Sequence, residues 1–543
     1  MAEYEDLGHC KEIDENKDMP GIVKWYLPHH AVLKPSNTTT KCRVVFDASA
    51  KVSGRSLNDV LKVGAINQSD LQSIVLRFRE PCYVLSADIT KMYRQIIVDE
   101  CHTPLQRVFW RIDPSCRLRV LELTTVTYGT ASAPFLATRA LLKLAIDERA
   151  KYPMAADIIE KDCYVDNALF GFNDLSTASA AQEQLVQLLS AGGFHLHKWS
   201  SNSPKLLEKI PQCDREELVC IGAEEAIKTL GLMWNPASDE LIFSSAPSDD
   251  KKTPTKRHLL SVIAHMYDPL GLVAPVIVIG KLLMHRIWKA KLNWDESITG
   301  ELKNEVETFL RAIDGVSQLR IPRQIVNSDA AVFELHGFAD ASMYAYGACV
   351  YIRSLVPEKK IDVKLLCAKS KIVPKDVLTI PRKELLAAGL LVRLVEKILS
   401  ALNTALNEII LWSDNQIVLA WLQKNPSQLD LYVSNRVREI KESGEQFRWK
   451  YVNTNENPAD LVSRGQSADK LLSNDLWWNG PRFLRDEMYE IDSPEKLADE
   501  DIPELKCVSA VQAVVNMDVL PIFFKYESFK KIATSVGVHI AVL

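Results

Sequence analysis

Short apolar runs alternate with amphipathic helical segments along the first half of the chain. The strand-like runs are CRVVFDAS, YVLSADI and CYVDNALFGF, which are rich in β-branched and aromatic residues. Apolar positions at helical spacing occur in SDLQSIVLRF, and PFLATRALLKLAIDERA begins with Pro134, which the first turn of a helix tolerates. A third helix is expected in TASAAQEQLVQLLSAGG, from a Ser/Thr cap to a stop at Gly192. Residues 20 to about 240 are therefore predicted to form an α+β unit.

The pattern changes in the second half of the chain. Residues 250–330 are predicted to be mostly helical, and residues 331–465 return to strand, then helix, then strand. Residues 470–543 open with Trp477 and Trp478 and continue into an acidic stretch typical of a linker. Stacking on nucleic-acid bases is one interpretation of the two tryptophans, and burial in the core is the favoured one. The pattern predicts a multidomain chain, α+β followed by α/β.

Length and composition fit a globular protein with several domains. The chain has 543 residues, 47% of them hydrophobic and 25% charged. The longest apolar stretch, from Leu270 to Met284, is interrupted by two glycines, a proline and a lysine, so we expect no membrane span. The N-terminus lacks the apolar run of a secretory signal. Eleven cysteines without a C-x-x-C pair argue against a disulfide framework or a zinc ribbon, and indicate a reducing, intracellular compartment.

The net charge of −5 conceals a polarised chain. Residues 1–20 and 486–504 carry local charges of −5 and −8, whereas residues 34–62 and 251–291 carry +4 and +7. Local basic surfaces, rather than the global charge, attract a phosphate backbone. The alternative is that these stretches are simply solvated faces, and charge alone does not decide between the two.

Two acids of the first half suit metal-dependent phosphoryl transfer. This chemistry uses two ions about 4 Å apart, held by carboxylates from different strands. Asp88 ends the apolar run YVLSADI, and Asp166 lies with Asn167 at the tip between two short apolar strands. Such a tip is typical of a hairpin, which would present Asp166 where Asp88 could meet it. The alternative is that Asp166-Asn167 is only a turn.

Four acids of the second half suit metal-dependent hydrolysis. Asp340 follows a strand pattern, Glu384 falls in the first turn of a long helix, Asp414 ends the strand EIILW, and Asp460 follows a proline in a loop. Acids at helix starts are often only caps, which is the alternative for Glu384 and Asp414. Four carboxylates that converge would repel one another unless cations lay between them. The set therefore predicts a two-metal nuclease site.

Six motifs in the first half resemble, in order, those of retroviral-type reverse transcriptases, in the form found in Pao/BEL retrotransposons. They are LPHHAVLKPSNTTTKCRVVFDASAK, SADITKMYRQI, VTYGTASAPFLATRAL, CYVDNALFG, GGFHLHKW and TLGLMWN. The resemblance implies a right-hand polymerase fold of fingers, palm and thumb, with Asp88 and Asp166 as palm metal ligands. The family has Tyr-x-Asp-Asp where this chain has Asn167. A lost unit charge near the metals is worth roughly 2–3 kcal/mol, or about a hundredfold in rate, so we expect an impaired polymerase.

The same resemblance assigns roles to residues around the two acids. Lys34 and Arg43 match the cations that hold the incoming triphosphate, and Gly129 matches a glycine that lets the backbone approach the template–nucleotide pair. Tyr93 matches the aromatic gate that excludes a 2′-OH, with a core tyrosine as the alternative. Lys198 matches a proposed proton donor to pyrophosphate, with an ordinary surface lysine as the alternative. Residues 230–234, LGLMW, match the hairpin that grips the primer end.

Residues 331–465 resemble the RNase H domain of retroelements, and their acids match its Asp-Glu-Asp-Asp set. The resemblance implies a five-stranded mixed sheet with flanking helices, and Mg²⁺ (or Mn²⁺) as cofactor, two ions per active site. The implied partners are an RNA template, a DNA primer, dNTPs and an RNA/DNA hybrid, with no membrane. The expected location is intracellular, in cytoplasmic virus-like particles with access to the nucleus. Nothing in the sequence predicts the oligomeric state.

These expectations give a division of the chain and three functional hypotheses. The segments are 1–20, acidic; 21–245, fingers and palm; 246–330, thumb and connection; 331–470, RNase H-like; and 471–543, acidic linker and a stretch resembling the approach to an integrase. No Asp-Thr/Ser-Gly triplet is present, so an aspartic protease site is not expected. The hypotheses are an active polymerase with RNase H, an RNase H with an inert polymerase half, and a non-catalytic nucleic-acid-binding relic.

Overall fold

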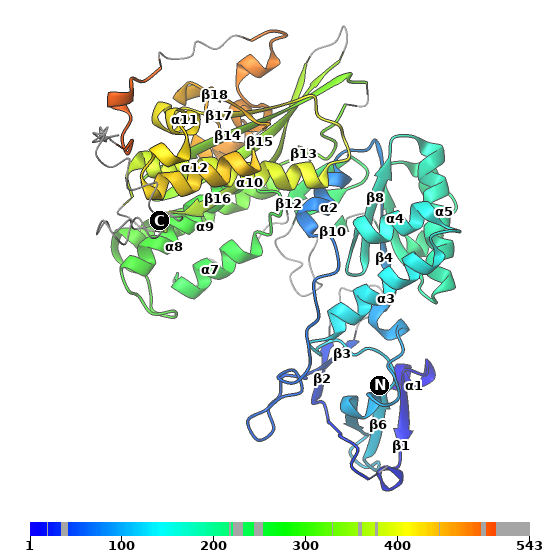
Figure 1. Ribbon diagram of the computed structural model, residues 1–543. Coiled ribbons are helices and arrows are strands. Elements are labelled where there is room, and N and C mark those ends of the chain that lie inside the picture. The colour runs from blue at the N-terminus through cyan, green and yellow to red at the C-terminus, as the bar shows by residue number, and fades with distance from the viewer. Residues whose placement is uncertain are drawn as a thin grey trace, which may run out of the picture.

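Three regions follow one another in space as they do along the chain (Figure 1). The N-terminal strands occupy one end, the β4 and β8 region lies next, and the β14–β18 region forms the other end. The computed structural model describes residues 1–18, 20–33, 42–216, 219–220, 232–243, 254–327, 329–356, 361–374, 378–444, 446–489 and 496–506.

The N-terminal region is built from β-structure. A sheet of order β1-β6-β5 and a separate β2-β3 ribbon enclose a small core that includes Tyr4, Leu27 and Phe46. The acidic first residues belong to this region, because Glu5 pairs with Arg119 at 2.8 Å. The elements are α1 (Ala2–Asp6), β1 (Cys10–Ile13), β2 (His29–Leu33), β3 (Cys42–Phe46), β5 (Arg107–Trp110) and β6 (Arg119–Leu123).

The second region is an antiparallel sheet of order β7-β8-β4-β9 covered by helices. Its helices begin where polar caps allow: the Asp70 side chain caps α2, and Pro134 lies in the first turn of α3 as expected. The expected Ser/Thr cap of α5 is wrong, because the carboxylate of Asp174 accepts the Thr177 N–H instead. The elements are α2 (Leu71–Phe78), β4 (Tyr83–Ile89), α3 (Ala133–Glu148), α4 (Pro153–Lys161), β7 (Cys163–Tyr164), β8 (Asn167–Phe172), α5 (Leu175–Ala191), β9 (Leu196–Ser201) and α6 (Pro204–Leu207).

Residues 254–327 are mostly helical, as predicted, and their helices pack against the last region (Figure 1). A small sheet of order β10-β11-β12-β13 lies between the halves of the chain, and its Trp234 meets Phe78 of α2 edge-on. The elements are β10 (Val219–Cys220), β11 (Leu232–Asn235), β12 (Glu240–Phe243), α7 (Lys256–His265), α8 (Ala274–Lys289), α9 (Gly300–Ala312) and β13 (Ile321–Pro322).

The last region is a five-stranded mixed sheet of order β16-β15-β14-β17-β18. β14 pairs antiparallel with β15 and parallel with β17, and β17 pairs parallel with β18. The long helix α10 packs on β14 and β15. The elements are β14 (Val332–Ala341), β15 (Ala345–Leu355), β16 (Asp362–Ile372), α10 (Ile380–Ala401), β17 (Glu408–Ser413), α11 (Gln416–Gln423), α12 (Leu431–Ser443), β18 (Arg448–Tyr451), α13 (Asp460–Arg464), α14 (Ala468–Leu472) and α15 (Asp475–Asn479).

The expected linker after residue 470 is packed on the last region: α15 lies on β16, and Pro503 and Glu504 contact α11 and α10. Trp477 is fully buried, as favoured from the sequence, and its indole N–H donates to the Leu272 carbonyl at 2.9 Å. The buried Arg353 donates to the carbonyls of Leu484 and Asp486. Apolar and backbone contacts therefore fix a segment whose acidic composition indicated a linker.

Helix α2 joins the two halves of the molecule, and it lies beside α10 in Figure 1. Arg79, at its end, is fully buried and donates to the carbonyls of Leu365 and Leu366 on β16. The next residue, Glu80, accepts the backbone N–H groups of Asn403 and Thr404 just beyond α10. Buried charged groups of this kind need all their partners, so the two halves are held in one fixed arrangement.

Two smaller expectations concern cysteines and the membrane. Nine cysteines whose side chains the structure describes are free thiols. None of the helices in the described part of the chain combines the length and apolar character that a membrane span requires.

Candidate active sites

Three acids of the second half converge at one end of the mixed sheet. Asp340 is near the end of β14, Asp414 directly follows β17, and the two strands run parallel, which brings their ends together. Glu384 lies in the second turn of α10, one turn later than predicted, because the helix begins at Ile380; α10 packs on β14. One carboxylate oxygen from each of the three acids lies within 4.8 Å of the others. The structure thus brings together three of the four predicted nuclease acids.

Burial and mutual repulsion shape the charge of this triad. Asp340 is 3% exposed and Glu384 is 7% exposed. Burial, opposed by a hydrogen bond from Ser463, raises the pKa of Asp340 to about 6. Burial and the charges of Asp340 and Asp414 raise the pKa of Glu384 well above its ordinary value. Burial also raises the pKa of Asp414. Such a cluster favours the binding of either protons or cations.

The fourth predicted acid, Asp460, stands beside the triad. It begins α13 and forms an ion pair with Arg464 one turn later. Its charge contributes to the raised pKa of Asp340, so it lies within electrostatic reach. The sequence reasoning missed Arg464 and Ser463, whose hydroxyl donates to Asp340. The only sequence signal for them is their position within one helical turn of Asp460.

The triad fits a divalent metal by its donor atoms. Carboxylate oxygens are the ligands that Mg²⁺ and Mn²⁺ prefer. The Oε2 atom of Glu384 is buried and has no hydrogen-bond partner among the described residues. An orphaned, buried carboxylate oxygen is costly unless a proton or a cation satisfies it. Asp340, Glu384 and Asp414 are therefore the residues that would hold a divalent ion.

The second candidate site lies on the antiparallel sheet of the first half. Asp88 of β4 pairs with Asn167 of β8, and the Ile89 N–H donates to the Asp166 carbonyl at 2.7 Å. Asp166, in the turn before β8, therefore lies at the same end of the sheet as Asp88 of β4, as the hairpin hypothesis predicts. The amide of Asn167 donates to Oδ1 of Asp166 at 3.1 Å.

The turn that presents Asp166 is strained. Val165 and Asp166 connect β7 to β8, and Val165 has a φ of 54°. A β-branched residue at positive φ is an outlier, with a cost on the order of 1–3 kcal/mol. The Val165 N–H donates to the Gln68 side chain at 3.1 Å, which helps to hold the turn. Strain of this kind concentrates where a side chain must be presented in a fixed way.

Lys198 contacts Asp88 directly. Its ammonium lies 2.8 Å from Oδ2 of Asp88, and the two side chains are 16% and 17% exposed. The imidazole of His197 lies 3.8 Å from the other oxygen, Oδ1. The alternative that Lys198 is an ordinary surface lysine is therefore wrong. No spacing rule reveals the contact, because it depends on the register of β9 against β4.

Of the remaining predicted residues, Tyr93, Gly129 and Arg43 are among those that the structure describes. Tyr93 is half-buried and meets Tyr128 edge-on, with ring centroids 6.2 Å apart. Gly129 has a φ of 96°, and an added Cβ would lie 2.3 Å from the Phe46 carbonyl, so the protein's own backbone already requires glycine there. Arg43 is exposed on β3. Lys34 and the first two residues of LGLMW lie outside the described residues.

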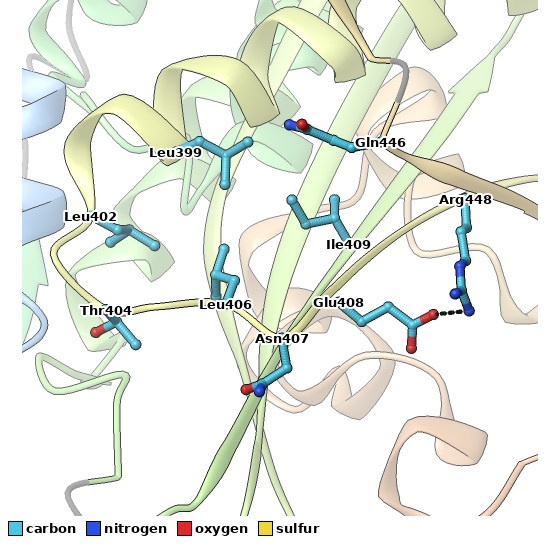
Figure 2. Close-up of a pocket in the computed structure, with 9 residues that line it drawn as sticks. All are labelled: Leu399, Leu402, Thr404, Leu406, Asn407, Glu408, Ile409, Gln446 and Arg448. Atoms are coloured by element: carbon cyan, nitrogen blue, oxygen red, sulfur yellow. Dashed lines mark hydrogen bonds and ion pairs between the residues drawn. The ribbon is translucent and has the colours of Figure 1, made fainter.

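A cavity of about 430 Å³ lies away from both sets of acids (Figure 2). It is bounded by Leu399 and Leu402 at the end of α10, by Thr404, and by Glu408 and Ile409 of β17. Several of its polar groups are already engaged: Glu408 forms the ion pair with Arg448 of β18 drawn in Figure 2, and the Thr404 hydroxyl donates to Glu80. None of the predicted acids lines this cavity, so it is separate from both candidate sites.

Solved structures with a similar fold are those of the foamy viral protease-reverse transcriptase. They include a complex of its dRH form with double-stranded DNA, at 15% identity and a TM-score of 0.51, covering 83% of this chain and 68% of that chain. A complex with an RNA/DNA hybrid has 15% identity and a TM-score of 0.50, with coverage of 83% and 52%. A further complex with double-stranded DNA has 16% identity and a TM-score of 0.50, with coverage of 83% and 81%. At this identity the likeness shows the fold alone.

Sequence comparison identifies one similar domain family. Residues 255–415 match the model of the Pao retrotransposon-like RNaseH-like domain. The matched range contains Asp340, Glu384 and Asp414. No curated protein matches the chain. The match of this domain and the reverse transcriptase-like fold together support a Pol fragment of the Pao/BEL retroelement type.

Proposed function

We propose that the second half of the chain is a ribonuclease H that hydrolyses the RNA strand of RNA/DNA hybrids. The observation that carries the proposal is the triad of the buried Asp340 and Glu384 with the half-buried Asp414, in which one oxygen of Glu384 has no partner among the described residues. The match of this region to the Pao RNaseH-like family supports it. Mg²⁺ or Mn²⁺ would be held by the triad, with Asp460 completing a site for two ions.

The chain's own residues prepare the site for this chemistry. Ser463 donates to Asp340 and so fixes the orientation of that carboxylate, while Thr454 and Asn457 oppose the effect of burial by lowering the pKa of Asp414. Arg464 limits the negative charge at Asp460. When bound, divalent ions in such a site generate a hydroxide nucleophile and neutralise charge on the phosphate. The protein supplies rigid ligands and a buried, low-dielectric environment.

Cleavage of an RNA/DNA hybrid tests the nuclease directly. The full chain is incubated with a hybrid labelled on the RNA strand in the presence of Mg²⁺, beside an Asp340→Asn variant. We expect at least a thousandfold loss of RNA cleavage in the variant, because a site for two cations loses a buried ligand charge. Equal cleavage by both proteins would refute the proposal. No cleavage by either protein would favour a non-catalytic nucleic-acid-binding relic.

We further propose that the first half is an RNA-directed DNA polymerase of reduced activity. The proximity of Asp88 and Asp166 at one end of the sheet supports this second function. In a right-hand arrangement this sheet would be the palm, the N-terminal region the fingers, and residues 246–330 the thumb and connection. The ligands would be an RNA template, a DNA primer and dNTPs, with Lys34, Arg43, Tyr93 and Gly129 at the nucleotide.

Primer extension on an RNA template tests the polymerase. An Asn167→Asp variant restores the missing carboxylate and is expected to extend the primer about a hundredfold faster than the unmodified chain. An Asp88→Asn variant is the inactive control. Vigorous extension by the unmodified chain, without gain from Asn167→Asp, would contradict an impaired site. In the cell, this activity would belong to cytoplasmic virus-like particles with later access to the nucleus.

A further inference from the structure

A distorted place in β9 directs Lys198 toward the polymerase acids. β9 pairs antiparallel with β4, with Ser86 opposite Ser200 and Asp88 opposite His197. Over this stretch β9 therefore contains one residue more than β4, which is a β-bulge. Lys198 lies in the bulge with a φ of 54°, in the left-handed region that favours glycine. Bulges next to active sites commonly re-aim a side chain, and the side chain re-aimed here is a cation.

The ammonium of Lys198 satisfies the carboxylate that a metal ion would use. It lies 2.8 Å from Oδ2 of Asp88, with both side chains largely shielded from water. The other acid, Asp166, accepts a hydrogen bond from the amide of Asn167. Each carboxylate of this site therefore already has a donor from the protein itself, and the chain carries no third acid at position 167.

The nuclease triad shows the opposite arrangement. It brings three carboxylates together, and the Oε2 atom of Glu384 is buried without a hydrogen-bond partner among the described residues. The polymerase site has two carboxylates and one ammonium, which leaves one formal negative charge. A site with one negative charge suits fewer divalent cations than a site with three or four.

We propose that Lys198 is a built-in cation of the polymerase site that takes the place of one of its two metal ions. The polymerase half then holds a single divalent ion, whereas the nuclease site holds the pair. The replacement of the family's second aspartate by Asn167 agrees with this, because a lysine and an asparagine together lower the need for a second dication. The inference rests on the proposed polymerase function and concerns the metal content of that same site.

Counting bound Mn²⁺ by electron paramagnetic resonance tests the inference without an activity assay. The full chain carries Asp340→Asn and Glu384→Gln, so that Mn²⁺ bound at the nuclease site does not mask the other half. This background is expected to bind one Mn²⁺. We expect the added Lys198→Met substitution to make a second Mn²⁺ bind at least tenfold more tightly than it does when Lys198 is present, a difference of about 1.4 kcal/mol. Lys198→Arg retains the positive charge and is expected to leave the count at one.

Two further variants keep the test decisive. Lys209→Met removes an exposed lysine that pairs with Glu183 and is expected to change nothing. Asn167→Asp restores a carboxylate and leaves Lys198 in place, so it tests the same site even if Lys198→Met fails to fold. We expect Asn167→Asp to raise the affinity of this site for a second Mn²⁺ ion. Two tight Mn²⁺ ions in the background, unchanged by Lys198→Met, would overturn the inference. If Asp340→Asn did not lower the number of Mn²⁺ ions bound by the wild-type chain, the proposed nuclease site would be overturned instead.

Discussion

Glu80 of the first half holds Thr404 of the second half by two hydrogen bonds. Oε2 of Glu80 accepts the Thr404 backbone N–H at 2.8 Å and its hydroxyl at 2.6 Å. Glu80 is buried and lies eight residues before Asp88, while Thr404 follows the helix α10 that begins near Glu384. The contact therefore links the framework of one candidate site to the framework of the other.

Thr404→Val should weaken this link without altering either site. The valine keeps the shape but removes a hydroxyl that bonds a buried carboxylate, so we expect the free energy of unfolding to fall by about 1.5 kcal/mol. Urea unfolding followed by tryptophan fluorescence measures the change. The matched control is Thr308→Val, where an exposed hydroxyl bonds only its own helix, with an expected change within about 0.5 kcal/mol. Equal effects of the two variants would contradict the link.

The nuclease triad should make the metal-free protein less stable as the pH rises. The pKa of Asp340 is raised from 3.8 to about 6 in the folded chain, so folding favours its protonated form. This contribution is fully present below pH 3.8 and is lost as the pH rises through about 6, an effect of roughly 2–3 kcal/mol. In EDTA, the melting temperature should fall over this window.

Two controls separate the triad from other titrating groups. Asp340→Asn cannot ionise, so its melting temperature in EDTA should depend less on pH between 4 and 7 than that of the wild type. Mg²⁺ should raise the melting temperature of the wild type above pH 6, where the carboxylates are free to bind it. A wild-type profile that is parallel to that of Asp340→Asn would exclude the triad as the source.

The bulge at Lys198 should carry a measurable backbone cost. Lys198→Gly and Lys198→Met both remove the ammonium, but only glycine adopts a φ of 54° without strain. We expect Lys198→Gly to be more stable than Lys198→Met by about 1 kcal/mol in urea unfolding. If methionine proved equal or better, position 198 would not be strained, and the bulge would lose its significance.

Most helices and strands that hold the candidate site residues are predictable from local sequence patterns. The strand run YVLSADI and the helical pattern around Pro381 are strong local patterns, so the sequence predicts the correct elements for Asp88 and Glu384, although α10 begins one residue before Pro381. The parallel pairing of β14 with β17 then brings Asp340 to Asp414, as the interpretation of the four acids required.

The remaining features depend on contacts between distant segments. The ion pair of Lys198 with Asp88 follows from a one-residue bulge, which no periodicity reveals. The burial of Arg79 depends on carbonyls of β16, almost three hundred residues later. The acidic composition after residue 470 indicated a linker. The segment is nevertheless packed, because a few apolar side chains such as Trp477 are buried in the core.

Glu384→Gln gives the most direct test of the nuclease site. Because the pKa of Glu384 is raised well above its ordinary value, glutamine imitates the protonated side chain of the metal-free protein. The variant should therefore fold as stably as the wild type in EDTA, yet lose cleavage of the RNA strand of a hybrid in Mg²⁺ by at least a thousandfold. Cleavage at the wild-type rate by a stably folded Glu384→Gln chain would contradict the claim that this triad holds the catalytic metal.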